Sequence, residues 1–90
     1  MIVVFSEDFY KDIEKISDKK IINRAISTIE KFESATSLRD INNIKAMRGY
    51  PYFYRIRFGD YRIGFQLLDK NTVRVLAIDH RSKIYKHFPE

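Results

Sequence analysis

The stretch YFYRIRFGDYRIGFQLLDKNTVRVLAI, residues 52–78, decides the fold, because its apolar residues recur at every second position. Apolar and aromatic side chains alternate with arginines and other residues over 52–58 and again over 61–67. Between these runs lies Gly59-Asp60, a two-residue turn signal with glycine first. The pattern predicts a β-hairpin, with strands on either side of this turn.

A two-residue turn fixes which residues face each other across the hairpin. On one face every expected pair is apolar or aromatic: Phe58–Tyr61, Ile56–Ile63, Tyr54–Phe65 and Tyr52–Leu67. We assign this face to the core. On the other face Arg57 lies opposite Arg62, and Arg55 lies opposite Gly64, whose missing side chain is expected to leave open space.

Three arginines on one small patch oppose folding, because like charges directly opposite each other destabilise a strand pair. An anionic ligand would turn this repulsion into binding, since a guanidinium grips phosphate through two hydrogen bonds and stacks on bases. The competing interpretation is a solvated strand face with arginines chosen for solubility, which predicts mixed charges. Within the hairpin no acid lies on this face, and Asp60 is at the turn. We therefore favour anion binding.

Two amphipathic helices are predicted upstream, after a short strand over residues 2–5. Ser6 and Asp18 stand where N-caps are expected. Behind each cap, apolar residues recur with helical spacing: Phe9, Ile13 and Ile16 in the first helix, and Ile22, Ala25, Ile26, Ile29 and Phe32 in the second. These stripes are assigned to the core rather than to a site.

The remaining segments complete an α+β domain over residues 1–90. A second turn at 69–71 leads into Val73 to Ile78, which is apolar on both faces apart from Arg74 and so indicates a central or well covered strand. The order β-α-α-β-β-β predicts a helical hairpin packed on one face of a mainly antiparallel sheet.

Two segments have weaker patterns. Residues 34–50 have few periodic signals, although Ile44 and Met47 are expected to tuck under the domain. Residues 81–88 are compatible with a short final helix or an extended tail.

Composition narrows the class of protein. The 90 residues include no Cys, which excludes disulfides and thiolate chemistry, and no apolar run reaches the roughly 20 residues of a membrane span. The apolar residues 1–5 lack the flanks of a signal peptide, so a soluble cytoplasmic protein is expected. Residues 41–90 hold 10 Lys and Arg against 4 Asp and Glu, so the net charge of +5 arises in this half. This basic excess suggests nucleic acid, an anionic membrane surface or an acidic protein as partner, or serves only solubility.

The C-terminal segment can add to the arginine patch. If residues 81–88 fold back beside the hairpin, they bring Arg81 and Tyr85, which would share one face of a helical turn, together with an imidazole. Such a set suits RNA cleavage, which needs a base for the 2′-hydroxyl, positive charge near the phosphorane and an acid for the leaving oxygen. A plain surface position is the simpler interpretation of His80 and of His87, and Tyr85 is equally compatible with packing.

The run YRIRFGDYRIGFQLLDKNTVRVLAIDHRSKIYK, residues 54–86, resembles toxins of the RelE/ParE superfamily, and the RelE branch best. The shared features are a Tyr-basic-apolar-basic strand, a Gly/Asp turn, Tyr-Arg, a hydrophobic strand, and then an Arg and a Tyr near the C-terminus. The β-α-α order and KAMRGYP, residues 45–51, also match, so the resemblance covers nearly the whole chain.

The resemblance implies the toxin of a type II toxin–antitoxin pair, a ribosome-dependent endoribonuclease that cleaves mRNA in the ribosomal A site through the 2′-hydroxyl. It implies mRNA, the ribosome and an adjacently encoded RelB-like antitoxin as partners, and no cofactor, metal or membrane. A toxin dimer and a toxin–antitoxin heterotetramer are both compatible with it. Carried over by position, the catalytic candidates are Arg55, Arg57, Arg62, Arg81 and Tyr85. The RNA-binding candidates are Arg55, Arg57, Arg62, His80, Arg81 and Lys83.

One departure concerns the base. Well-studied RelE enzymes carry Lys where this chain has Arg55 and Arg57, and arginine is effectively always protonated. Either Tyr85, His80 or His87 takes the role of base, or the arginines stabilise charge and a weaker activation suffices. Two other functions stay open: inhibition of DNA gyrase, as in the ParE branch, and RNA binding without catalysis. The arginine set together with Tyr85 favours the nuclease.

Overall fold

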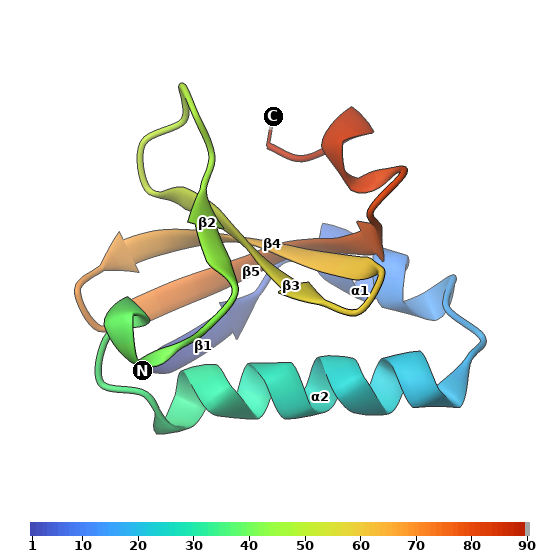
Figure 1. Cartoon of the computed structure of the whole chain (residues 1–90), viewed down its shortest axis with the longest axis horizontal. Helices are drawn as coiled ribbons and strands as arrows, with labels where there is room; N and C mark the ends of the chain where they lie inside the picture. The colour runs from blue at the N-terminus through green and yellow to red at the C-terminus, as the bar shows by residue number, and fades with distance from the viewer. Residues whose placement is uncertain (90) are drawn as a thin grey trace.

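A five-stranded mixed sheet forms the centre of the computed structural model, which describes residues 1–89 (Figure 1). The strand order is β1-β5-β4-β3-β2, in which β1 runs parallel to β5 and every other pair is antiparallel. The strands are β1 (Ile2–Phe5), β2 (Ile44–Ala46), β3 (Phe53–Phe58), β4 (Tyr61–Asp69) and β5 (Thr72–His80). The predicted α+β class is confirmed, and β5, predicted to be central or well covered, is an interior strand between β1 and β4.

The hairpin register is confirmed over β3 and β4. Arg57 pairs with Arg62, and Arg55 pairs with Gly64. Gly59 has φ +56°, the left-handed conformation that a glycine-first hairpin turn requires. The assignment of Tyr52 to the core is wrong, because this residue also has φ +69° and its side chain is 66% exposed. β3 therefore begins at Phe53, one residue later than the alternating pattern predicts.

Both helices cap as expected and pack beside the sheet. They are α1 (Glu7–Glu14), where Ser6 Oγ accepts from the Phe9 amide, and α2 (Lys19–Ser34), where Asp18 Oδ1 accepts from the Lys20 amide. Figure 1 shows α2 running along the opposite side of the sheet from the C-terminal segment. The placement of Ile26 in the core is wrong: it is 52% exposed.

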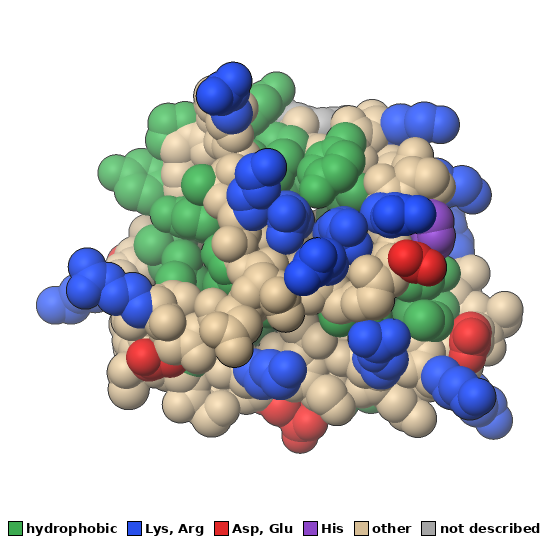
Figure 2. Space-filling view, in the orientation of Figure 1, with side chains coloured by type: hydrophobic (Ala, Val, Ile, Leu, Met, Phe, Trp, Pro, Cys, Tyr) green, Lys and Arg blue, Asp and Glu red, His purple; other side chains and the backbone are tan. Residues whose placement is uncertain are grey.

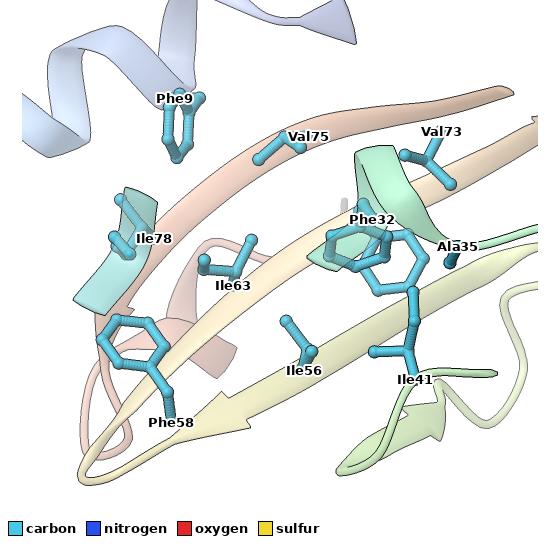
Figure 3. Packing of buried hydrophobic residues seen from close by; sticks show 12 residues of the cluster. Phe9, Phe32, Ala35, Ile41, Ile56, Phe58, Ile63, Val73, Val75 and Ile78 are labelled. Atoms are coloured by element: carbon cyan, nitrogen blue, oxygen red, sulfur yellow. The ribbon is translucent and has the colours of Figure 1, made fainter. Parts of the chain in front are cut away.

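The main core lies between the helices and one sheet face (Figure 3). Phe32 of α2 is fully buried, and its ring meets that of Phe65 edge-on, with centroids 4.7 Å apart. Phe9 adds the contribution of α1. Around these rings lie the apolar residues of the hairpin face and of β5, namely Ile56, Phe58, Ile63, Val73, Val75 and Ile78.

One strand was not predicted. Ile44–Ala46 forms β2 and pairs with β3, placing Ile44 opposite Ile56. Three residues are too few for an alternating pattern to be visible in the sequence. The expected tucking of Ile44 and Met47 is confirmed, since Ile44 packs on the main core and Met47 on a second cluster beneath the C-terminal segment.

The link before β2 contains a 3-10 helix, η1 (Leu38–Asp40). Asp40 accepts hydrogen bonds from the Thr36 hydroxyl and from the amides of Thr36 and Ser37, and these bonds hold the pKa of its carboxyl below the ordinary value. Among residues 1–89, no helix is long and apolar enough to cross a membrane.

Candidate functional site

A row of three charged residues crosses the face of the sheet opposite the main core. The strand register places Arg57 of β3 opposite Arg62 of β4, and Arg62 opposite Asp79 of β5. Directly opposed residues in antiparallel strands have Cα atoms roughly 4.5–5.5 Å apart, so the three side chains emerge side by side. Figure 2 shows Lys and Arg side chains gathered across the middle of the molecule.

Asn43 holds the first pair of arginines. Arg55 Nη1 donates to the Asn43 carbonyl oxygen at 3.0 Å, and Arg57 Nη2 donates to the Asn43 side-chain oxygen at 3.2 Å. Asn43 has φ +69°, a conformation that asparagine tolerates better than most residues. Sequence reasoning missed this residue, and its signal was the Asn42-Asn43 pair just before β2.

The β3–β4 turn holds the second pair. Arg62 Nη1 donates to the carbonyl oxygens of Gly59 at 3.1 Å and Tyr61 at 2.9 Å. The Arg81 amide donates to the Asp60 carbonyl oxygen at 2.7 Å, and its guanidinium Nε lies 3.8 Å from the Asp60 carboxylate. The turn thus brings Arg62 and Arg81 together across 19 residues of sequence.

The space beside Gly64 is not open, so that expectation is wrong. Gly64 is buried, and a Cβ atom built on it would lie 2.6 Å from three atoms of the Phe88 ring. Phe88 is 3% exposed and clusters with Ala77 and Ile84 on this sheet face. The C-terminal segment therefore folds back over the sheet, anchored by Ile84 and Phe88.

The segment itself forms a turn and a 3-10 helix, η2 (Ile84–Lys86). The segment is a short final helix only over residues 84–86, so no helical turn spans Arg81 and Tyr85, and the condition under which they would share one face is not met. Lys83 and Tyr85 are exposed, with Tyr85 at 52%. Neither makes a side-chain hydrogen bond to the arginines in the part of the chain that is described.

The two imidazoles occupy different surroundings. His87 Nε2 lies 3.0 Å from Asp79 Oδ2, on the arginine face. His80 pairs with Tyr61, and its ring meets the Tyr61 ring edge-on at 5.6 Å. Its Nδ1 accepts from the Ser82 amide at 3.1 Å and lies 2.8 Å from the Ser82 hydroxyl. A cleft between α1 and the C-terminal segment is lined by both, together with Asp79 and Lys83.

The charge of this face is only partly balanced. Asp79 was missed in sequence reasoning because the acid lies on β5, outside the hairpin, yet the register places it next to Arg62. Its Oδ2 is already engaged by His87 and its Oδ1 by the His80 amide. Arg55 Nε is buried without a hydrogen-bond partner among residues 1–89. Arg55, Arg57 and Arg62 donate to neutral oxygen acceptors and keep their charge available to an anion. The Arg81 guanidinium is the exception, because it lies 3.8 Å from the Asp60 carboxylate.

Among the described residues, no three His, Cys, Asp or Glu side chains gather in a way that could hold a metal ion. The groups that the arginine face offers are the fixed positive charges of its guanidinium groups and the His87 imidazole beside Asp79. Positive charge near a phosphoryl group stabilises the extra negative charge that develops there in a transition state.

Comparisons with known proteins agree on one family. Residues 3–85 match the family model described as ParE toxin of type II toxin-antitoxin system, parDE. A curated relative, Toxin RelE3 of Methanocaldococcus jannaschii, is 37% identical over 90 residues, covering 99% of this chain and 100% of the relative.

Solved structures of RelE toxins and of RelB-RelE complexes are also similar to this chain. The RelB-RelE antitoxin-toxin complex from Methanococcus jannaschii contains a chain 34% identical to this one, with a TM-score of 0.78, 96% of this chain covered and 99% of the other. The isolated E. coli RelE toxin gives 27% identity and a TM-score of 0.63, with 94% and 90% covered. An archaeal RelE-RelB complex from Pyrococcus horikoshii OT3, at 19% identity and a TM-score of 0.71, shares the fold over 91% and 96% of the two chains.

Proposed function

Because the chain belongs to the RelE/ParE family of toxins from type II toxin–antitoxin systems, we propose that it is a ribosome-dependent endoribonuclease. It would enter the ribosomal A site and cut the mRNA there, with the 2′-hydroxyl as nucleophile. This activity would stop translation in the cytoplasm. The antitoxin partner in this proposal is a RelB-like protein, by analogy with the RelB-RelE complexes among the relatives.

The observation that carries the proposal is the Arg57–Arg62 pair. These two side chains are opposed across β3 and β4, and their hydrogen bonds go to the neutral oxygens of Asn43, Gly59 and Tyr61. Opposed cations weaken the sheet. A phosphodiester bound between them would relieve the repulsion and receive charge-assisted hydrogen bonds from both.

The other candidates have defined roles in this proposal. Arg62 and Arg81 would hold the scissile phosphate from the side of the turn, and Arg55 and Arg57 from the side of Asn43. Tyr85 would stack on or orient a nucleotide, since an exposed aromatic ring offers a face to a base. Lys83 and His80 would contact the RNA along the cleft that they line.

Primer extension on an mRNA in a cell-free translation reaction tests this function. We expect the full chain to produce cuts only when ribosomes are present. Arg62→Ala should reduce cleavage by about 10²–10³-fold, the usual cost of one transition-state donor. Arg39→Ala is the matched control, because Arg39 is an exposed arginine of η1 outside the row.

Other results would redirect the interpretation. Absence of cuts with inhibition of DNA gyrase supercoiling would favour the ParE-type function. Salt-sensitive RNA binding without any cleavage would favour a binding module. Loss of far-UV circular dichroism in Arg62→Ala would mean that this residue serves the fold.

A further inference from the structure

The chain has two histidines, and their hydrogen bonds give them different proton arrangements. A neutral imidazole carries one proton, and the nitrogen that accepts a hydrogen bond must be the bare one. His80 Nδ1 accepts from the Ser82 amide, so in neutral His80 the proton is on Nε2. The basic nitrogen of His80 is thus already occupied.

His87 has the opposite arrangement. Its Nε2 lies 3.0 Å from the Asp79 carboxylate, which can only accept, so the proton of neutral His87 is on Nε2. Nδ1 is left bare and able to take a proton. The carboxylate also stabilises the imidazolium that forms when Nδ1 is protonated, as in other carboxylate–histidine pairs.

The place of this pair relative to the arginines is fixed by the sheet. Asp79 is the β5 partner of Arg62, so the carboxylate that contacts His87 emerges from the strand next to Arg62, at the end of the Arg57–Arg62 row. The next residue, Phe88, is locked over Gly64, and the His87 amide donates to the Ile84 carbonyl oxygen at 3.2 Å. The position of His87 is therefore held by three contacts: its ring contacts Asp79, its amide bonds to Ile84, and the next residue packs on Gly64.

Resting on the nuclease function proposed above, we propose that His87 is the general base for the 2′-hydroxyl and that Asp79 positions it. The 2′-oxygen bonds to the adjacent phosphorus while its proton passes to His87 Nδ1. The bond from phosphorus to the 5′-oxygen breaks, and that oxygen leaves with the electron pair and takes a proton from water. His87 then returns its proton to solvent, leaving a 2′,3′-cyclic phosphate and a 5′-hydroxyl.

This assignment supplies the proton acceptor that the arginines cannot provide. Arg55 and Arg57 stay protonated at neutral pH and supply only charge.

The charged and titratable groups around His87 come from three parts of the fold, namely the sheet, the C-terminal segment and α1. They are Asp79 and His80 of β5, Arg62 and Tyr61 of β4, Lys83, Tyr85 and Lys86 of its own segment, and Asp8, Lys11, Asp12 and Lys15 of α1 across the cleft.

His87→Gln is the decisive variant, because a glutamine amide can still donate to Asp79 but offers no basic nitrogen. Single-turnover cleavage of mRNA on purified ribosomes is measured from pH 5 to 9. In the wild-type protein the rate should rise with pH, because the base must be unprotonated to accept the proton of the 2′-hydroxyl. In His87→Gln the rate should fall by about 10²–10⁴-fold and this rise should disappear.

The matched control is His80→Gln, which should keep the pH-dependent rise whatever its absolute rate. Asp79→Asn should lower the rate and keep RNA affinity, because an asparagine amide can stabilise the wrong tautomer of His87. Thermal unfolding followed by circular dichroism checks that each variant is folded.

The outcomes separate the two proposals. A wild-type protein that never cuts ribosome-bound mRNA removes the nuclease function, and this assignment with it. A wild-type protein that cuts, with His87→Gln retaining its rate and pH profile, overturns only the assignment of the base. Loss of the pH-dependent rise in His80→Gln instead would assign the role to His80.

Discussion

Gly64→Ala should undock the C-terminal segment. The added methyl would lie 2.6 Å from three atoms of the Phe88 ring, well inside the roughly 3.5–4.0 Å of an ordinary carbon contact. These atoms belong to the near side of a ring that is 3% exposed, so rotation of a flexible end cannot relieve the clash. The ring must shift or leave its place on the sheet.

The magnitude follows from what Phe88 loses. Full burial of a phenylalanine side chain stabilises a fold by about 1.5–3 kcal/mol. Gly64→Ala should therefore lower the free energy of unfolding by about this amount if it expels the ring. A double-mutant cycle isolates the effect: in a Phe88→Ala background the same Gly64→Ala change should cost close to nothing, because no ring remains to be displaced.

Urea unfolding followed by circular dichroism measures all four proteins of the cycle. Exchange of the Phe88 amide, which donates to the Ile84 carbonyl oxygen at 3.0 Å, reports undocking directly and should accelerate in Gly64→Ala. Equal costs of Gly64→Ala with and without the Phe88 ring would refute the reasoning. Cleavage should fall in parallel, because undocking also removes His87 from Asp79.

Two further predictions concern the link before β2. Asn43→Gly keeps the left-handed backbone and should stay within about 1 kcal/mol of the wild-type stability, whereas Asn43→Ala should add roughly 1–2 kcal/mol of backbone strain, as urea unfolding can measure. Both variants lose the hydrogen bond to Arg57, so both should cleave mRNA more slowly in primer extension. Asp40 binds its proton less readily in the fold than in the unfolded chain, so its contribution is present above the ordinary pKa of 3.8 and is lost as pH falls through the lower folded value. Asp40→Asn should therefore lower the urea midpoint at pH 7, and the gap to the wild type should close below pH 3.8; a gap that persists in acid would contradict this account.

Local patterns predicted most of the fold. The two-residue turn determined every pair from β3 to β4, because a period of two leaves no freedom once the turn is known. The caps at Ser6 and Asp18 likewise depend on neighbouring residues only. Ile26 was wrongly placed in the core because it lies beside the buried stripe of α2, and its hydrophobic character does not show that it faces solvent.

The candidate site was less accessible to sequence reasoning because its geometry depends on long-range packing. Phe88 fills the space at Gly64 from 24 residues away, and nothing in the alternating pattern reveals that a distant ring occupies a glycine gap. Asp79 follows an apolar run whose register includes irregularities near Gly64 and Leu67, so its alignment with Arg62 could not be counted from a turn. The arginine grouping was predictable, whereas its acidic neighbour was not.

The arginine face reduces the stability of the fold, which indicates that its cations serve a ligand rather than the fold. Arg57 opposes Arg62, and Lys45 opposes Arg55 in the neighbouring pair, so two like-charge pairs stand on adjacent strands. Each such pair costs stability, by a fraction of the ~0.2–1 kcal/mol that a good cross-strand pair provides. If these cations served the fold, their removal would weaken it. We expect the opposite combination for Arg57→Ala and Arg62→Ala: stability that is unchanged or slightly higher, with lower cleavage, because the repulsion is retained for a ligand that brings negative charge.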